Sequence, residues 1–460
     1  MSKNVFRRAY RLTLKLGLLT CSALACADAP APILGTNNIT HEAFTQPLSI
    51  MPDSAREAFF RGRSLFRQNW VIAPAGDDQV DGLGPLHNRI SCISCHAANG
   101  KGHAPNGPHE KAGFLLVRLS VPGANPNGGP LPHPVYGDQL NEDAIPGVPA
   151  EGRVQIHWRE HKVTLTGGEV VRLRSPRIAF RDLAYGPMGK VQTSARIGPA
   201  VFGLGLLDAV PVEALEKLAA ENQAYGVRGK LNLVHDAASA QTMPGRFGLK
   251  ANRSVLRDQI AGAMIGDLGI TSTLFTEENC MPAQKQCRQA PNGNSPDGHS
   301  ELNDEQLDEL ERYLAFLAPP LPRNMNAPEV EQGRRLFNDM GCAACHRPQL
   351  PLGRHKLLGD LRGQNIAPYT DLLVHDMGAD LADHRSDFRA GGREWRTAPL
   401  WGAGLLKKMN ARVGYLHDGR ARTVQEAILW HGGSASPARN NYSQAPRDQR
   451  NAVLSFIGSL

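Results

Sequence analysis

Apolar residues recur at helical spacing in two segments that lie far apart along the chain. After Asn303, a typical helix N-cap with Gln306 three positions on, leucines occupy positions 307, 310, 314 and 317. The pair Pro319–Pro320 ends this pattern. A similar apolar cluster closes the chain, at positions 453, 454, 456, 457 and 460. The pattern predicts one helix after Asn303 and another at the end of the chain.

The segment at about residues 115–275 has a more mixed pattern. Two runs there are typical of strands, Val154–Trp158 and Lys162–Leu173, with Thr166–Glu169 as a turn. Two others are typical of helices, Val212–Ala220 and Arg253–Ile265. We therefore predict an inserted, partly β subdomain over this segment.

A short repeat relates two parts of the chain. Gly62–Phe66 and Gly333–Phe337 share the pattern G-R-x-L-F, each inside a run that is typical of a helix. A CxxCH motif follows each copy. Cys92 comes 26 residues after Phe66, and Cys342 comes five residues after Phe337.

The motifs Cys92-Ile93-Ser94-Cys95-His96 and Cys342-Ala343-Ala344-Cys345-His346 indicate the chemistry most specifically. The two thiols of such a motif can add to the vinyl groups of one haem, and the adjacent histidine then binds the iron. Zinc sites and redox dithiols also use CxxC. Two copies, each with a histidine and each after the same helix pattern, favour haem. We predict two covalently bound haem c groups, held by Cys92, Cys95, His96, Cys342, Cys345 and His346.

An opening helix, a CxxCH motif, loops and a closing helix follow one another in cytochrome c domains. The expected fold is therefore mainly α, with two cytochrome c-like domains, long loops and a partly β insertion in the first. We expect the N-terminal haem domain at residues 50–320, with its insertion at about 115–275. The C-terminal haem domain is expected at residues 328–460, after a proline-rich linker.

Residues 1–27 are typical of an export signal. Basic residues precede the ten-residue apolar run Leu16–Ala25, which is too short to span a membrane as a helix. Cleavage after Ala27 fits, and so does cleavage before Cys26, which would leave a cysteine for a lipid anchor. We expect a periplasmic protein without a transmembrane segment, with a lipid anchor at Cys26 as the alternative.

The remaining charge and cysteines change this picture little. Five of the 51 basic residues lie in the export signal, which leaves 46 basic against 44 acidic residues and no sign of a nucleic-acid partner. Cys21 and Cys26 belong to the signal. Cys280 and Cys287 are expected to form a disulfide in an oxidising compartment, with a redox role as the alternative.

The second axial ligand of each haem decides what that haem can do. An iron with ligands on both faces carries electrons, whereas an open face can bind peroxide or oxygen. The candidates in the second unit are His375, Met377, Met409, His417 and His431. Candidates for moving a proton near the first haem are His157, Glu160, His161 and Arg196. Trp70, Trp395 and Trp401 are candidates for an electron relay or for the core.

Seven further segments carry a resemblance to a known family. They are Asp81–Leu86, Gly203–Asp208, Gly245–Lys250, Pro368–Gly378, Glu394–Gly402, Tyr415–Ala421 and Glu426–Gly433. The chain resembles the di-haem oxidoreductase family, whose members are often labelled peroxidases or thiol oxidoreductases. The resemblance covers nearly all of the chain after the export signal.

This family is similar to the bacterial di-haem cytochrome c peroxidases, and that similarity implies ligands and roles. In those peroxidases a methionine just before His-Asp-Gly binds the electron-transferring haem, but Leu416 stands there in this chain and cannot bind iron. We therefore expect His417 as the sixth ligand of the second haem, with His431 and His375 as alternatives. The similarity also implies a reactive N-terminal haem and a calcium ion, for which Asp371, Asp376 and Asp380 are candidates.

Three functions follow from these expectations. The first is a periplasmic oxidoreductase that reduces peroxide, in which a periplasmic donor feeds the C-terminal haem and that haem feeds the N-terminal one. The second is oxygen-dependent oxidation of a substrate, for which the long insertion is the motive. The third is a non-enzymatic electron carrier, in which both haems are six-coordinate.

Overall fold

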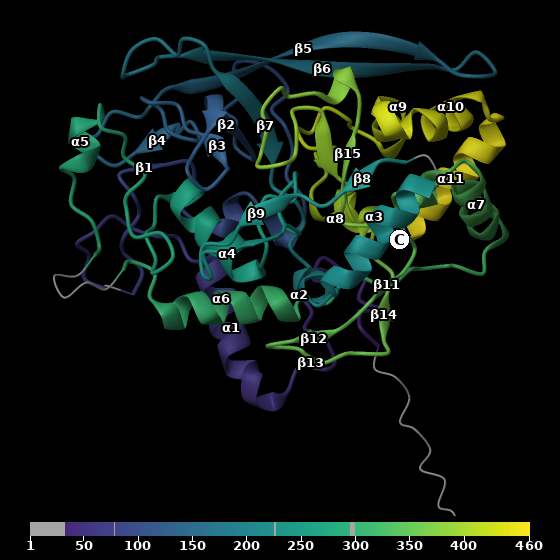
Figure 1. The fold of residues 1–460 in the computed structure, drawn as a ribbon, viewed down its shortest axis with the longest axis horizontal. Helices are drawn as coiled ribbons and strands as arrows, with labels where there is room; N and C mark the ends of the chain where they lie inside the picture. Colours follow the sequence, from purple (N-terminus) through teal and green to yellow (C-terminus); the bar gives the residue numbers. More distant parts are fainter. Residues whose placement is uncertain (1–32, 78, 225–226, 295–299) are drawn as a thin grey trace, which may run out of the picture. The chain divides into compact units, whose positions relative to one another are not determined.

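Two pairs of helices pack together in the fold (Figure 1), and along the chain the two members of each pair flank one CxxCH motif. Helix α1 (Asp53–Arg67) packs on α6 (Asp304–Phe316), and α7 (Pro328–Asp339) packs on α11 (Arg447–Ser459). Both predicted helices are therefore confirmed, and Asn303 and Gln306 form the expected capping box. The computed structural model describes residues 33–77, 79–224, 227–294 and 300–460, and Ile33–Leu460 form one compact unit. The predicted export signal lies outside the described residues.

The glycine of each repeat lies where two helices cross. A Cβ atom at Gly62 would overlap the carbonyl oxygen of Glu309 on α6, and one at Gly333 would overlap that of Ala452 on α11. The backbones therefore touch at these crossings, which only glycine permits. This close contact is the physical reason for the G of the G-R-x-L-F repeat.

The phenylalanine of each repeat links the closing helix to the motif histidine. The ring centroid of Phe66 lies 5.6 Å from that of Tyr313 and 6.1 Å from that of His96. The ring of Phe337 lies 5.3 Å from that of Phe456 and 6.3 Å from that of His346. The two halves thus repeat one local arrangement of helix, aromatic ring and imidazole.

The Gly333→Ala variant is expected to lose about 2 kcal/mol or more of its free energy of unfolding, because the added methyl group would force α7 and α11 apart. Denaturant unfolding of the haem-loaded protein measures this loss. Gly458→Ala is the matched control, since Gly458 also lies in α11 but has open space around its Cβ position. Equal unfolding midpoints for the two variants would contradict the tight crossing.

The expectation of a mainly α fold is wrong, because the chain is 30% helical and 20% strand. The longest strands, β5 (Arg153–Thr164) and β6 (Val170–Arg181), form an antiparallel hairpin where strands and a turn were predicted. Strand β2 (Leu115–Ala124) pairs with β7 (Gln192–Ile197) and β3 (Pro130–Leu131). Strands β2 and β7 were not predicted individually, although they lie within the segment expected to be partly β. The other unpredicted strands are two or three residues long and carry too few positions to show a period of two.

The short strands tie loops together around the motifs. Strand β15 (Val374–Asp376) lies between β16 (Glu394–Arg396) and β8 (Gly229–Lys230). Four two-stranded sheets complete the set: β1 (Leu86–His87) with β4 (Asp143–Ala144), β9 (Leu233–His235) with β10 (Thr242–Pro244), β11 (Leu350–Pro351) with β14 (Asn365–Ile366), and β12 (Arg354–His355) with β13 (Gly359–Asp360).

The described residues form seven further helices: α2 (Leu204–Asp208), α3 (Val212–Ala224), α4 (Leu256–Ala263), α5 (Lys285–Arg288), α8 (Leu406–Met409), α9 (Val424–Trp430) and α10 (Ser436–Gln444). Helices α3 and α4 confirm the two helical runs predicted at Val212–Ala220 and Arg253–Ile265. Helix α4 continues into a π-helical turn, Met264–Leu268. The predicted disulfide between Cys280 and Cys287 is confirmed. Within the described ranges, we find no helix with the length and apolar character that a membrane span requires.

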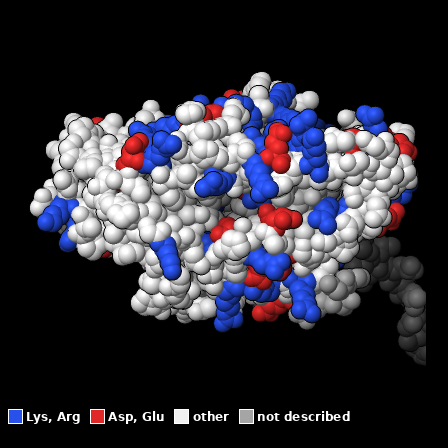
Figure 2. Space-filling view, turned by 90° about the horizontal axis from the view of Figure 1, so that it is seen from above, with Lys and Arg blue, Asp and Glu red and all other residues white. Residues whose placement is uncertain are grey.

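The β5–β6 hairpin packs against the C-terminal part of the chain. Leu165 and Val171 share a hydrophobic cluster with Phe337 and Phe456. The backbone N–H of Thr166 also donates to the carbonyl of Ser443, at 3.1 Å. Figure 2 shows the face that carries this hairpin, on which basic and acidic side chains are interspersed. The predicted domain boundaries are not tested by these contacts and stay predictions.

Candidate haem sites

Both CxxCH motifs adopt the same local structure and line the same cavity. Each begins with a short 3-10 turn, Cys92–Ser94 or Cys342–Ala344, and the histidine N–H donates to the first cysteine's carbonyl at 3.0 Å in both. All six predicted haem-binding side chains line a cavity of 1290 Å³. That volume exceeds the range of roughly 300–1,000 Å³ that is usual for one small-molecule site.

The two motif histidines are held in the orientation that an iron ligand needs. Nδ1 of His96 lies 2.7 Å from the carbonyl of Pro199, and Nδ1 of His346 lies 2.9 Å from that of Tyr369. A carbonyl only accepts a hydrogen bond, so each Nδ1 carries the proton and each Nε2 keeps its lone pair. Burial lowers the pKa of both imidazoles, that of His346 to about 4, which keeps them neutral near pH 7.

The four motif cysteines are free thiols and do not form a zinc site. Burial raises the pKa of Cys92, Cys95 and Cys342 to about 12, so these thiols are protonated near pH 7. In the described part of the chain, three metal-ligating side chains converge, and they are those of Cys345, Asp371 and His375. The two cysteine pairs do not converge on a common site. Unpaired thiols beside a buried neutral histidine fit covalent haem better than zinc or a disulfide.

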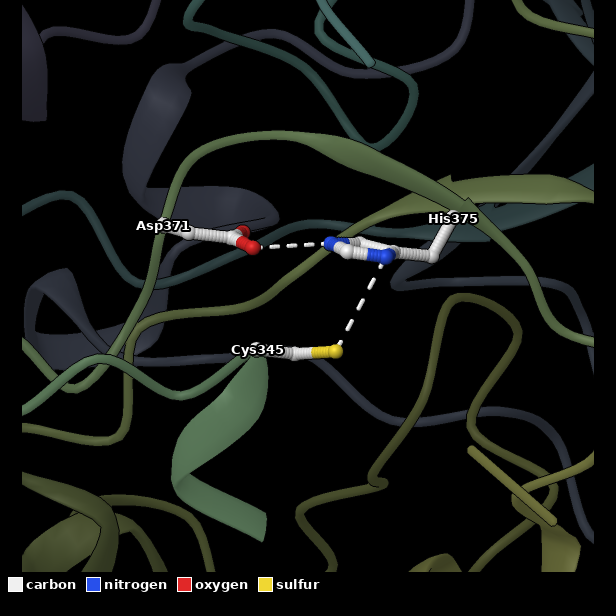
Figure 3. Close-up of side chains that lie close together, drawn as sticks. All are labelled: Cys345, Asp371 and His375. Carbon is white, nitrogen blue, oxygen red and sulfur yellow. Dashed lines mark hydrogen bonds and ion pairs between the residues drawn. The ribbon is translucent and has the colours of Figure 1, made fainter. Parts of the chain in front are cut away.

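His375, one of the predicted sixth ligands, is engaged beside Cys345 (Figure 3). Its Nδ1 lies 3.7 Å from the Cys345 sulfur, and its Nε2 lies 2.8 Å from a carboxylate oxygen of Asp371. Burial alone would lower the pKa of His375, but the hydrogen bond to Asp371 and the neighbouring Cys345 raise it to about 10. Both ring nitrogens are therefore occupied by neighbours.

The carboxylates predicted to bind calcium lie in different surroundings. Asp371 is buried against His375, and Asp376 accepts from the Gly378 N–H at 2.7 Å. Asp380 is exposed. Among the described side chains these three do not form a converging ligand set, and the calcium ion stays a prediction.

His417, the predicted sixth ligand, lines the cavity with its ring stacked on Trp395. The two ring centroids are 3.6 Å apart and the planes differ by 8°. Nε2 of His417 lies 3.4 Å from the carboxylate of Asp418. Trp401 also lines the cavity, whereas Trp70 is a buried core residue outside its lining. Leu416 lines the cavity at the position where the peroxidases carry methionine.

His431 lies at the end of α9 and faces the histidine of the second motif. Its Nδ1 lies 2.7 Å from the carbonyl of Ala427, in the same turn. Its ring centroid lies 6.4 Å from that of His346, and the two planes differ by 43°. Of the predicted methionine candidates, Met377 lines the cavity and Met409 does not.

One of the four predicted proton-transfer candidates lines the cavity. Arg196 on β7 lines it and forms an ion pair with the buried Asp387. His157 and Glu160 are exposed on β5, and His161 lies 2.7 Å from the hydroxyl of Ser175. None of these three lines the cavity.

Sequence reasoning missed a carboxylate beside the first motif. Asp267 lies in the π-helical turn after α4 and lines the cavity. It accepts a hydrogen bond from the Gln139 amide at 3.0 Å, and its Oδ1 lies 3.9 Å from Nη2 of Arg118. Burial raises the pKa of Asp267, and the charge of Arg118 opposes that rise. The sequence marks Asp267 in one way, as an acidic residue inside an apolar run. The structure marks it in another, because π-helical turns occur often at functional sites.

One of three comparisons with known proteins identifies the family of the chain. No curated protein matches the chain. Among solved structures, hydrazine synthase of Kuenenia stuttgartiensis aligns with 13% identity and a TM-score of 0.34, over 99% of this chain and 100% of that one. The family model described as "Di-haem oxidoreductase, putative peroxidase" matches residues 34–460. The chain therefore belongs to this family of di-haem oxidoreductases.

Proposed function

We propose that the protein is an exported oxidoreductase with two haem c groups that reduces peroxide with electrons from a periplasmic donor protein. The observation that carries the proposal is the pair of CxxCH motifs on one cavity, each with free thiols and a histidine whose Nε2 is available. Cys92, Cys95 and His96 would hold one haem, and Cys342, Cys345 and His346 the other. When bound, the haems supply one-electron chemistry and a place for peroxide to bind.

The overall reaction needs two electrons and two protons for each peroxide. Hydrogen peroxide accepts both, its O–O bond breaks, and two water molecules form. The electrons come from the donor protein, one at a time. The protons must reach the peroxide oxygens inside a buried cavity, so the chain needs a titratable group there.

Asp267 is the group that we assign to this proton transfer. It lines the cavity near the first motif, and its charge acts on His96, Cys92 and Cys95. A carboxyl group whose pKa is raised by burial holds a proton at higher pH than an exposed one, and Arg118 stabilises the anion that remains after transfer.

A difference between the two motif histidines supports a reactive N-terminal haem. Within the described residues, the ring paired with His96 is that of Phe66, and no imidazole faces it. His346 has His431 beside it. An open face at the first haem would admit peroxide, while the second would pass on electrons. Trp395 and His417 line the same cavity and offer a stacked aromatic pair for that transfer.

Optical and EPR spectra of the purified haem-loaded protein test this proposal. We expect one high-spin haem that binds carbon monoxide when reduced and one low-spin haem. Hydrogen peroxide is expected to oxidise the reduced protein in a two-electron reaction, with steady turnover when a donor protein is supplied. Two low-spin haems that ignore peroxide would leave an electron carrier. Oxygen uptake with an added substrate, without peroxide turnover, would favour the oxygen-dependent enzyme.

A further inference from the structure

The separation of His346 and His431 is that of two imidazoles that bind one metal ion from opposite sides. Bonds of about 2 Å from each Nε2 to the metal, plus about 1 Å from each nitrogen to its ring centre, give about 6 Å between ring centres. The observed separation is 6.4 Å. The two rings therefore stand at the distance that a shared iron would require.

The hydrogen bonds of both rings support the same arrangement. Nδ1 of His346 donates to the Tyr369 carbonyl, and Nδ1 of His431 donates to the Ala427 carbonyl. Each bond fixes the tautomer that leaves the Nε2 lone pair free. Both residues line the cavity.

The position of His431 at the end of α9 fixes the orientation of its imidazole ring. The helix is capped by Thr423, whose hydroxyl accepts from the Glu426 N–H at 3.1 Å. The backbone N–H of His431 donates to the carbonyl of Ile428. With its backbone and its Nδ1 both held by the last turn of α9, the ring needs little reorganisation to bind iron.

The other candidates are held by other partners. Nε2 of His417 lies beside the Asp418 carboxylate, and one face of its ring is covered by Trp395. Nε2 of His375 is engaged by the carboxylate of Asp371, and its Nδ1 faces the Cys345 sulfur, the proposed point of covalent attachment. Leu416 offers no ligand atom.

We infer that His431, rather than His417, is the sixth ligand of the haem attached at Cys342 and Cys345. This inference rests on the proposed haem attachment and names the ligand that makes this haem an electron carrier. It assigns to the second haem two histidine ligands, and to His417 a place beside Trp395 in the cavity wall. It requires no peroxide chemistry, so it can hold even if the protein reduces another oxidant.

Carbon monoxide binding and EPR of the haem-loaded His431→Ala variant test the inference. We expect the wild-type protein to bind one carbon monoxide per chain when reduced, and the variant to bind two. The oxidised variant should also lose one low-spin EPR signal and gain a high-spin one. Added imidazole should reverse both changes, because it can occupy the space that the His431 side chain leaves.

His417→Ala is the matched control, since it removes a second cavity histidine that the inference does not place on iron. We expect it to keep the wild-type low-spin signal and to bind one carbon monoxide. Loss of that signal in His417→Ala and its retention in His431→Ala would overturn the inference. Retention in both variants would overturn it too, and would point to Met377 on the cavity wall.

A conservative variant keeps the test decisive if His431→Ala does not fold or load haem. His431→Met is expected to stay low-spin, to gain a long-wavelength sulfur-to-iron absorption band and to raise the reduction potential of one haem. An unchanged spectrum and potential would again overturn the inference. Absence of covalent haem in the wild-type protein would instead remove the proposed function, and a haem count on every sample separates the two results.

Discussion

Replacing Cys342 and Cys345 together by alanine is expected to reduce the covalently bound haem from two groups per chain to one. Thioether bonds need the cysteine sulfurs, and without them denaturation releases the haem. Mass spectrometry of the denatured protein measures the loss directly. We also expect peroxide turnover to fall to background, because the electrons from the donor would no longer have an entry point.

The double variant Cys280→Ser with Cys287→Ser is the matched control for haem attachment. These cysteines form a disulfide outside the cavity, so this variant should keep both haems. Its expected cost is a stability loss of about 2–3 kcal/mol, typical of a short disulfide loop. Two covalent haems in the Cys342 and Cys345 variant would contradict the attachment that we propose.

Replacing Asp267 by asparagine is expected to lower peroxide turnover by a factor of about 10²–10⁴, the usual contribution of a general acid or base. The haem spectra should stay unchanged, because Asp267 is not a proposed ligand. Burial raises the pKa of Asp267, and the protonated form is the donor. The wild-type rate should therefore fall as the pH rises through that raised pKa, and the variant should lose this part of the pH profile.

Asp138→Asn distinguishes proton transfer from a general change of charge. Oδ2 of Asp138 lies 2.9 Å from Nη1 of Arg118, whereas Asp267 lies near Nη2 of the same guanidinium. Asp138 is half-exposed. Asp138 also lines the cavity, and removing its charge perturbs Arg118 and removes one of the minor causes that raise the pKa of Asp267. The Asp267 carboxyl group stays in place, so we expect a turnover change of less than tenfold. Equal losses in the two variants would assign the effect to Arg118 and contradict the role of Asp267.

The features that the sequence predicts correctly are those set by local patterns. Helix α6 follows from leucine spacing and the Asn303 cap, and α11 follows from the apolar cluster that closes the chain. The disulfide follows from the two cysteines that remain outside the motifs and the signal. The strands of the long hairpin are readable because each has about a dozen residues and a Gly-Gly turn lies between them. The G-R-x-L-F repeat predicts two similar units, and Gly62 and Gly333 show the crossings that cause it.

The features that the sequence does not predict depend on contacts between distant segments. The strands around β15 join residues near 229, 375 and 395, and each is too short to show a pattern. The same limit applies to the site. His417 follows from a motif position, whereas the distance between His346 and His431 depends on how α9 packs. Asp267 is found only because a π-helical turn carries it to the cavity.

The β5–β6 hairpin limits how the chain can be divided into fragments. Leu165, Val171 and Leu173 complete a hydrophobic cluster whose other members come mostly from the C-terminal part of the chain. Arg450 on α11 also forms an ion pair with Glu169 in the hairpin, at 2.7 Å. A fragment of residues 328–460 made alone would therefore lack three apolar side chains of its own core and would expose the surface they cover. Adding residues 150–185 in trans is expected to restore this core. The N-terminal and C-terminal parts of the chain therefore depend on each other structurally and cannot be exchanged one at a time.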